Sequence, residues 1–454
     1  MDRPLILRWE PLDAPGVEEK AEACTWGRLE MRIQSEDGRH HVPTRLFDLR
    51  VSALRDAAYG TVLPLAEWMV HSWTHVFDSK RKRPGETGPD GQCYEWDRVH
   101  AVRYSGDGMA LPDLRVAARE EEGLDIEWRS DADSDADRAS FDPVRFVTHG
   151  RLQLPAAVVE QEFALFVDSV LQRLREYAVD DARARQLAED WRVVRDSRHS
   201  DFAAQRCGAL LGVLWWDTDP EEREHLRRLA DQADNPVLQG CLEPGCFGAI
   251  GEIEEFAASL WNESEETNRA PARWADLWAD LRSVTPAANG EPWHAGWSSA
   301  ETYRRAVGIR GDKVLPAKHW IGAWASLSQS QPPAGIDAVV AWRSGHRPIR
   351  VCDSSRGMGE RFAKVRDLYP ILFGPGPGED YAFVFSRQVA GRNSVANAFA
   401  AELLAPVALL KSHVASGVVG LHDVAEIAGR IRAPIQCVLH QIQNHRLAVL
   451  RHDY

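Results

Sequence analysis

The chain has 454 residues, too many for one compact core, and its 44% hydrophobic and 27% charged residues are typical of a globular protein with two or three domains. Its 54 basic and 68 acidic side chains give a formal net charge of −14, which argues against nucleic-acid binding because the field repels phosphate groups. Because no apolar run approaches the roughly 18 residues of a membrane span, the N-terminus lacks a secretory pattern, and the seven cysteines are scattered, we expect a cytoplasmic protein that does not contact a membrane.

Residues 1–154 are predicted to form a β-rich N-terminal domain. Alternating and β-branched residues between turn residues predict strands at Leu29–Gln34, His41–Val51, His100–Arg103 and Leu124–Trp128. The exception is Leu63–Phe77, which has a broad apolar face at helical spacing and Pro64 in its first turn. We expect this segment to form one helix.

Three residues of this predicted helix form a weak candidate metal site. Glu67, His71 and His75 are spaced by four, so their side chains share one face of the helix. Two imidazoles and a carboxylate can bind zinc, but no glutamate follows His71 to act as general base. A polar stripe opposite the core is the favoured interpretation, and zinc binding is the alternative.

Residues 155–284 are predicted to form a helical middle domain. A long amphipathic run starts at Pro155 and carries apolar residues at Val159, Phe163, Phe166, Val170 and Leu174. Further helical patterns cover Asp181–Val194, Phe202–Leu211, Pro220–Ala230 and Pro271–Leu281. Pro286, Asn289 and Gly290 then indicate a linker at Thr285–Glu291.

Residues 285–454 carry a paired signature. Residues 361–370 read RFAKVRDLYP, and residues 393–406 read NSVANAFAAELLAP. The pair resembles the ImmA/IrrE family of metallopeptidases, in which an R-F-x-x-x-H-E-x-x-H helix precedes a helix reading E-x-x-A-N-x-F-A-x-x-L-L-x-P. The positions that match the second helix are Ala396, Asn397, Phe399, Ala400, Leu403, Leu404 and Pro406. The resemblance runs from about Pro292 to Leu410 and implies a zincin-like α+β domain, so the whole chain is predicted to be a multidomain α+β protein.

The positions that hold zinc in this family carry other residues here. The resemblance aligns the first histidine with Arg366, the glutamate with Asp367, the second histidine with Pro370 and the third ligand with Asn393. A guanidinium group has no acceptor atom, proline offers no ligand and disturbs a helix, and a neutral amide is a poor partner for a dication. We therefore expect a peptidase-like fold with no zinc or other cofactor, and we assign no catalytic residue.

Arg366 places a permanent positive charge where the family holds a metal ion. A buried charge requires a partner, so we expect Arg366 to point toward the cleft and to pair with an acidic side chain. The candidates near it in the sequence are Asp367, Glu379, Asp380 and Glu402. Arg366, Tyr369 and Tyr381 are predicted to anchor a protein partner around the vacant metal position.

The segment Leu421–Leu447 has the pattern of a helix-turn-helix, with a break at residues 432–434. As a DNA reader its second helix would present Gln436, His440, Gln441 and His445, with Arg432 and Arg446 near its ends. As two packed helices, it would close the peptidase-like domain. The net charge of −14 and the absence of lysine after Lys411 favour the packed pair.

The sequence thus favours a catalytically inactive ImmA/IrrE-like protein that binds a protein partner as a sensor or scaffold. Active members of that family cleave repressors of stress-response, mobile-element or prophage-like genes, so the resemblance implies stress response, mobile-element control or phage defence in a bacterium. Two alternatives remain: an active zinc peptidase that uses His71 and His75 to cleave a regulator protein, and a helix-turn-helix DNA-binding regulator. The sequence predicts neither the partner's identity nor the oligomeric state.

Overall fold

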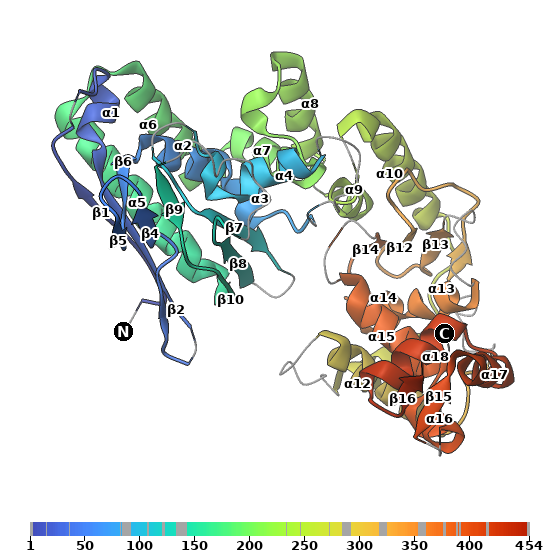
Figure 1. The fold of residues 1–454 in the computed structure, drawn as a ribbon. Coiled ribbons are helices and arrows are strands. Elements are labelled where there is room, and N and C mark those ends of the chain that lie inside the picture. Colours follow the sequence, from blue (N-terminus) through green and yellow to red (C-terminus); the bar gives the residue numbers. More distant parts are fainter. Residues whose placement is uncertain are drawn as a thin grey trace. The chain divides into compact units, whose positions relative to one another are not determined.

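The chain divides into two compact units, residues 1–232 and residues 233–454, each with its own hydrophobic core (Figure 1). The computed structural model describes residues 3–14, 16–35, 37–81, 83, 92–106, 109–119, 123–132, 143–232, 234–245, 247–271, 273–283, 292–316, 325–352, 360–375, 378–386, 389, 392–414 and 417–451. Among these residues, no single helix is long and apolar enough to cross a membrane.

The first unit contains small antiparallel sheets with strand orders β1-β2-β3, with β6 also paired to β2, then β10-β8-β7 and β5-β4-β9. Its strands are β1 (Leu5–Pro11), β2 (Trp26–Gln34), β3 (His40–His41), β4 (Leu46–Asp48), β5 (Ala53–Arg55), β6 (Ala58–Thr61), β7 (Asp113–Ala118), β8 (Gly123–Arg129), β9 (Val144–Phe146) and β10 (Gly150–Pro155). Its helices are α1 (Lys20–Cys24), α2 (Leu63–His71), α3 (Trp73–Phe77), α4 (Gln92–His100), α5 (Ala156–Tyr177), α6 (Ala182–Arg195), α7 (Ser200–Leu211) and α8 (Pro220–Ala230). The β-rich character predicted for residues 1–154 is present in these sheets.

The core of the first unit forms where α5 and the α2–α3 pair pack with the sheets. The apolar stripe predicted for the run after Pro155 is buried along α5, at Val159, Phe163, Phe166, Val170 and Leu174. The helix predicted over Leu63–Phe77 is divided at Ser72 into α2 and α3. The strand predicted at His100–Arg103 is wrong, because α4 extends to His100 and a 3₁₀ turn, Val102–Tyr104, follows it.

The second unit is built on a four-stranded sheet of order β11-β13-β12-β14. Its strands are β11 (Ser326–Leu327), β12 (Ala338–Trp342), β13 (Ile349–Cys352) and β14 (Tyr381–Phe385), and a separate parallel pair is formed by β15 (Val418–Gly420) and β16 (Val449–Arg451). Its helices are α9 (Pro236–Leu242), α10 (Ile250–Glu265), α11 (Arg273–Ser283), α12 (Pro292–Ala306), α13 (Glu360–Arg366), α14 (Leu368–Phe373), α15 (Arg392–Leu404), α16 (Val407–His413), α17 (Leu421–Ile431) and α18 (Ile435–Asn444). Every residue of β12 is buried, as expected for a central strand with helices around the sheet.

The segment 155–284, predicted as a helical middle domain, contributes helices to both units: α5 to α8 belong to the first, and α9 to α11 belong to the second. The linker predicted at Thr285–Glu291 lies outside the described residues. The strands β12 and β13 precede the signature helices in the chain.

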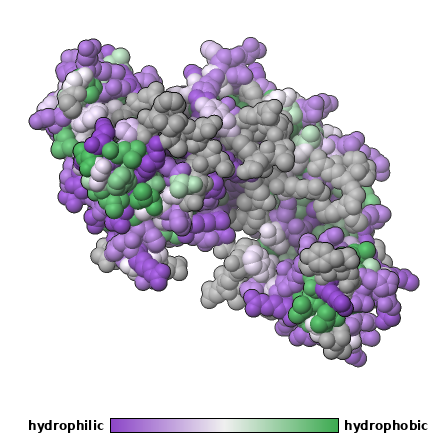
Figure 2. All heavy atoms as spheres, in the orientation of Figure 1, coloured by the Kyte–Doolittle hydropathy of each residue, from purple (hydrophilic) through white to green (hydrophobic). Residues whose placement is uncertain are grey.

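The surface of both units is largely hydrophilic. On the face drawn in Figure 2, apolar side chains gather over β4 and β5 in the first unit and over β15 and β16 in the second. Exposed apolar residues of these regions are Leu49, Val51, Leu54, Val418 and Val449.

Two local features shape the part of the second unit where the signature lies. Pro370 has no N–H to bond to the carbonyl of Arg366, and the helix is interrupted between α13 and α14 at Asp367. Gly296 lets α12 approach α15 closely, since a Cβ there would lie 2.3 Å from the carbonyl oxygen of Val395 and 2.8 Å from Cβ of Ala398. The first feature ends α13 at Arg366, and the second sets the spacing between α12 and α15, which both line the site.

Candidate functional site

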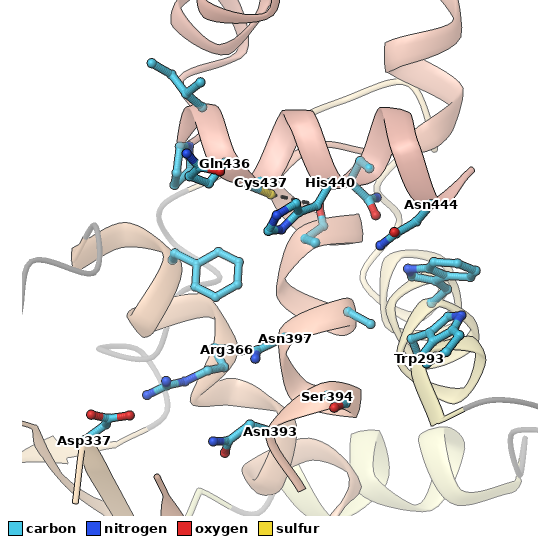
Figure 3. A pocket seen from close by; sticks show the side chains of 17 residues that line it. Trp293, Asp337, Arg366, Asn393, Ser394, Asn397, Gln436, Cys437, His440 and Asn444 are labelled. Carbon is cyan, nitrogen blue, oxygen red and sulfur yellow. Dashed lines mark hydrogen bonds between the residues drawn. The ribbon is translucent and has the colours of Figure 1, made fainter. Parts of the chain in front are cut away.

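A pocket of about 1040 Å³ opens in the second unit between α12, α13, α15 and α18 (Figure 3). Its described lining residues are Trp293, Trp297, Asp337, Phe362, Arg366, Asn393, Ser394, Asn397, Ala398, Ala401, Pro434, Ile435, Gln436, Cys437, His440, Gln441 and Asn444. Two of the four positions that the family resemblance assigns to the metal site, Arg366 and Asn393, are among them. The volume is in the range of pockets that hold a ligand or part of a partner chain.

Arg366 is buried and paired, as predicted. Its side chain lines the pocket with 2% of its surface exposed, and its Nε donates to Oδ1 of Asp367 over 2.8 Å. The guanidinium carbon also lies 3.9 Å from the ring centroid of Phe385, a cation–π distance. Figure 3 shows the guanidinium group pointing toward Asp337. The charge therefore has partners on more than one side.

Asp367 is shared between two arginines. Its Oδ2 accepts a hydrogen bond from Nε of Arg350 over 2.7 Å, and the residue has no exposed surface. Arg350 on β13 is also buried, and of the cluster Arg350–Asp367–Arg366 Arg366 lines the pocket whereas the other two residues do not. Because both carboxylate oxygens already accept charge-assisted hydrogen bonds, Asp367 is not placed to take a proton from a water molecule in the pocket.

The other aligned positions face different ways. Pro370 is buried in the first turn of α14 and does not line the pocket. Asn393 does line it, and its Nδ2 donates to the backbone carbonyl of Ser386. Its buried Oδ1 has no hydrogen-bond partner among the described residues. The structure thus brings Arg366 and Asn393 to one cavity but directs Pro370 into the core.

Neither tyrosine predicted as an anchor lines the pocket. Tyr369 stacks on Phe373 with ring centroids 5.5 Å apart, and Tyr381 lies against Trp342 at 4.8 Å. Both rings are used in packing within the unit. The aromatic side chains of the pocket are instead Trp293, Trp297 and Phe362; the four-residue spacing of the tryptophans was the available sequence signal.

The three residues of the weak metal candidate have separate partners. Glu67 accepts two hydrogen bonds from Arg183, at 2.6 and 2.7 Å, and Nε2 of His71 lies 3.3 Å from Oδ2 of Asp190. His75 is buried; this burial, with a smaller effect of His100, lowers its pKa to about 3. Within the described part of the chain, no group of three or more His, Cys, Asp or Glu side chains is arranged to hold a metal ion.

The second helix of the predicted helix-turn-helix, α18, forms a wall of the pocket. Gln436, His440 and Gln441 line the cavity, and the ring of His445 lies 3.9 Å from that of Trp297. The helix pair is present, with Arg432 in the left-handed conformation at the turn. The face proposed to read DNA bases is therefore directed toward the pocket, which favours the packed-pair interpretation.

A buried carboxylate ties α18 to α15. Glu402 accepts a hydrogen bond from Nε2 of Gln441 over 2.7 Å and another from the backbone N–H of Val407 over 3.2 Å. Burial raises the pKa of Glu402 to about 7, against the opposing effects of these hydrogen bonds and of Arg304. From the sequence, Glu402 was a candidate only for the acidic partner of Arg366.

Comparison of the chain with protein-family models, with curated proteins and with solved structures found no match.

Proposed function

We propose that this protein is a catalytically inactive member of the zincin-like ImmA/IrrE type and that it binds a protein partner in the pocket of its second unit, as a sensor or scaffold. The observation that carries the proposal is the cluster Arg350–Asp367–Arg366. Two of its members, Arg366 and Asp367, occupy the positions where the resemblance expects the first zinc ligand and the general base. A guanidinium group at the cavity wall opposes binding of a dication, and the engaged carboxylate cannot serve as base.

The pocket supports the binding role. It is lined on one side by Trp293, which has 39% of its surface exposed, and elsewhere by side chains that are uncharged apart from Asp337 and Arg366. Exposed aromatic anchors in a concave site are typical of places where a partner gains binding energy. The resemblance places this role in bacterial stress response, mobile-element control or phage defence, and we propose that the protein acts in the cytoplasm.

The test is capture of a native partner by the tagged full chain, expressed in its own host. The protein retained by the wild type is expected to be lost from Trp293→Ala, because the anchor in the pocket is truncated. It is expected to remain on Leu165→Ala, which removes an exposed apolar side chain in the first unit. A chelator is expected to leave retention unchanged, and elemental analysis is expected to find far less than one zinc ion per chain.

Two results would overturn the proposal. Equal retention by the wild type and by Trp293→Ala, with circular dichroism showing that the variant is folded, would remove the pocket from the function. Stoichiometric zinc together with peptidase activity that a chelator abolishes would identify an active metallopeptidase. If His71→Ala then lost the zinc, the first unit would become the metal site.

A further inference from the structure

Polar side chains repeat along the pocket wall formed by α18. Gln436, His440 and Asn444 are four residues apart and line the cavity, and Figure 3 shows His440 and Asn444 pointing into it. None of the three has a side-chain hydrogen bond to another described residue. Because an α-helix rises 1.5 Å per residue, these groups are spaced by about 6 Å along the wall.

An extended polypeptide has nearly the same repeat. Every second residue of a strand recurs after about 6.6 Å, and alternate residues direct their backbone N–H and C=O groups to the same edge. Over the two intervals from Gln436 to Asn444, the mismatch between the two repeats is only about 1 Å, which side-chain torsions can absorb. Amide and neutral imidazole groups each donate and accept hydrogen bonds, so this row is complementary to a backbone edge.

The remaining walls favour uncharged side chains. Trp293 and Trp297 repeat at the same four-residue interval on α12, and Phe362 adds a third apolar surface from α13. Of the described lining residues, only Asp337 and Arg366 carry a permanent charge, and Arg366 is already paired with Asp367. A charged side chain entering this cavity would lose hydration without gaining a free partner of opposite charge on Arg366.

Asn397 on α15 provides a polar group across the cavity from α18. Figure 3 shows its amide pointing into the pocket, and it has no hydrogen bond to another described residue. The pocket therefore offers uncommitted donors and acceptors from two directions.

We propose that the pocket binds an extended, uncharged segment of a partner protein along α18. The backbone of the segment bonds to Gln436, His440 and Asn444 at alternate residues. Its apolar side chains pack against Trp293 and Trp297. This inference rests on the proposed function and adds to it the conformation and charge of the bound segment.

The experiment uses the full chain and defined peptide libraries. One equimolar library consists of acetylated, amidated octapeptides with Ala, Val, Leu, Ser, Thr, Asn and Gln at the central positions. Two further libraries place Asp and Glu, or Lys and Arg, at two of those positions. The uncharged library is expected to yield binders at least about tenfold tighter than either charged library, because no desolvated charge is left unpaired.

The tightest uncharged peptide is then remade with single N-methyl groups at each position in turn. N-methylation at alternate residues is expected to weaken binding about tenfold, because it removes one backbone donor that faces α18, whereas methylation between them has a smaller effect. Gln436→Ala and Asn444→Ala are each expected to weaken binding of this peptide about tenfold. The matched control is Gln443→Ala, which removes an exposed amide on the same helix outside the pocket.

Three results would overturn the inference: equal or tighter binding by a charged library, N-methyl effects without alternation, or no loss for Gln436→Ala and Asn444→Ala in folded protein. Failure of this inference is distinguishable from failure of the proposed function. If any of these results occurs while Trp293→Ala still releases the native partner, the pocket binds that partner in another way. If Trp293→Ala retains the partner, the proposed function itself is wrong.

Discussion

Two buried arginines flank the buried carboxylate of Asp367 in the second unit. Arg350 and Arg366 donate to opposite oxygens of one carboxylate that has no exposed surface. Direct hydrogen bonds replace the water that these charged groups lose on burial. The guanidinium group of Arg366 also makes a cation–π contact with the ring of Phe385. A metal ion needs ligand atoms with lone pairs, and a guanidinium group has no acceptor atom, so neither arginine of this cluster can serve as a metal ligand.

Asp367→Asn is expected to destabilise the second unit by about 3–5 kcal/mol, because two buried guanidinium groups lose their shared carboxylate. Urea unfolding followed by far-UV circular dichroism measures the change. The control is Asp312→Asn, which breaks an exposed pair with Arg310 and is expected to shift the unfolding midpoint very little. Similar midpoints for the two variants would show that the buried cluster does not stabilise the fold.

At the scale of elements, the site depends on how closely α12 and α15 approach. Gly296 lies on α12 where its missing side chain would overlap the backbone of α15, only 2.9 Å from the backbone nitrogen of Phe399. The helices that carry Trp293 and Asn397 are therefore held at a separation that only glycine permits. The helix interruption between α13 and α14 also shapes the site, because α13 ends at Arg366, which lines the pocket.

Gly296→Ala is expected to destabilise the second unit by about 1–3 kcal/mol, because the added methyl group overlaps backbone atoms that cannot move alone. The same substitution is also expected to weaken partner retention, since it displaces the wall that carries Trp293. Thermal unfolding and partner capture measure the two effects.

The matched control is Gly429→Ala on α17, where an added Cβ meets no atom within 4 Å. Here the better helix propensity of alanine is expected to leave stability unchanged or raised by up to about 1 kcal/mol. Unchanged stability in Gly296→Ala would mean that α12 and α15 are not closely packed in solution.

At the scale of the whole molecule, the two units have separate cores, and their buried titratable groups make stability depend on pH in opposite directions. In the first unit, burial lowers the pKa of His75 to about 3 and of His100 to about 4. The unfolded chain binds these protons at higher pH than the folded unit, so stability is lost as pH falls below about 6.5. In the second unit, Glu402 has its pKa raised from 4.5 to about 7, so the folded unit binds the proton first and stability is lost as pH rises between those values.

Calorimetry is therefore expected to show two unfolding transitions that respond in opposite directions to a change from pH 7.5 to 5. The transition of the first unit is expected to move to lower temperature, and that of the second to higher temperature. Gly296→Ala assigns the second transition, because it lies only in that unit.

Glu402→Gln is the control for this prediction. Its side chain has nearly the same shape and keeps one acceptor oxygen, but it does not titrate, so the pH response of the second transition is expected to shrink. An identical response in the wild type and in Glu402→Gln would show that this carboxylate is not the group responsible.

Several local features of the structure could be predicted from the spacing of residues along the chain. The buried stripe of α5 and the helix pair α17 and α18 follow from the periodicity of apolar residues, which directly selects the buried face of an element. The pairing of Arg366 with Asp367 was also predictable, since a buried charge requires a partner and the neighbouring residue supplies one. The interruption after Arg366 follows from Pro370, which has no N–H.

Only the tertiary structure determined which partners these side chains contact. Tyr369 and Tyr381 pack against Phe373 and Trp342 instead of lining the pocket, and His75 contacts the carbonyl of Val213, far along the chain. Glu402 meets Gln441 in the same way, across 39 positions of sequence. Spacing determines which side of its own helix a residue occupies, but the partner on that side depends on the packing of elements distant in the sequence, and no local pattern encodes that packing.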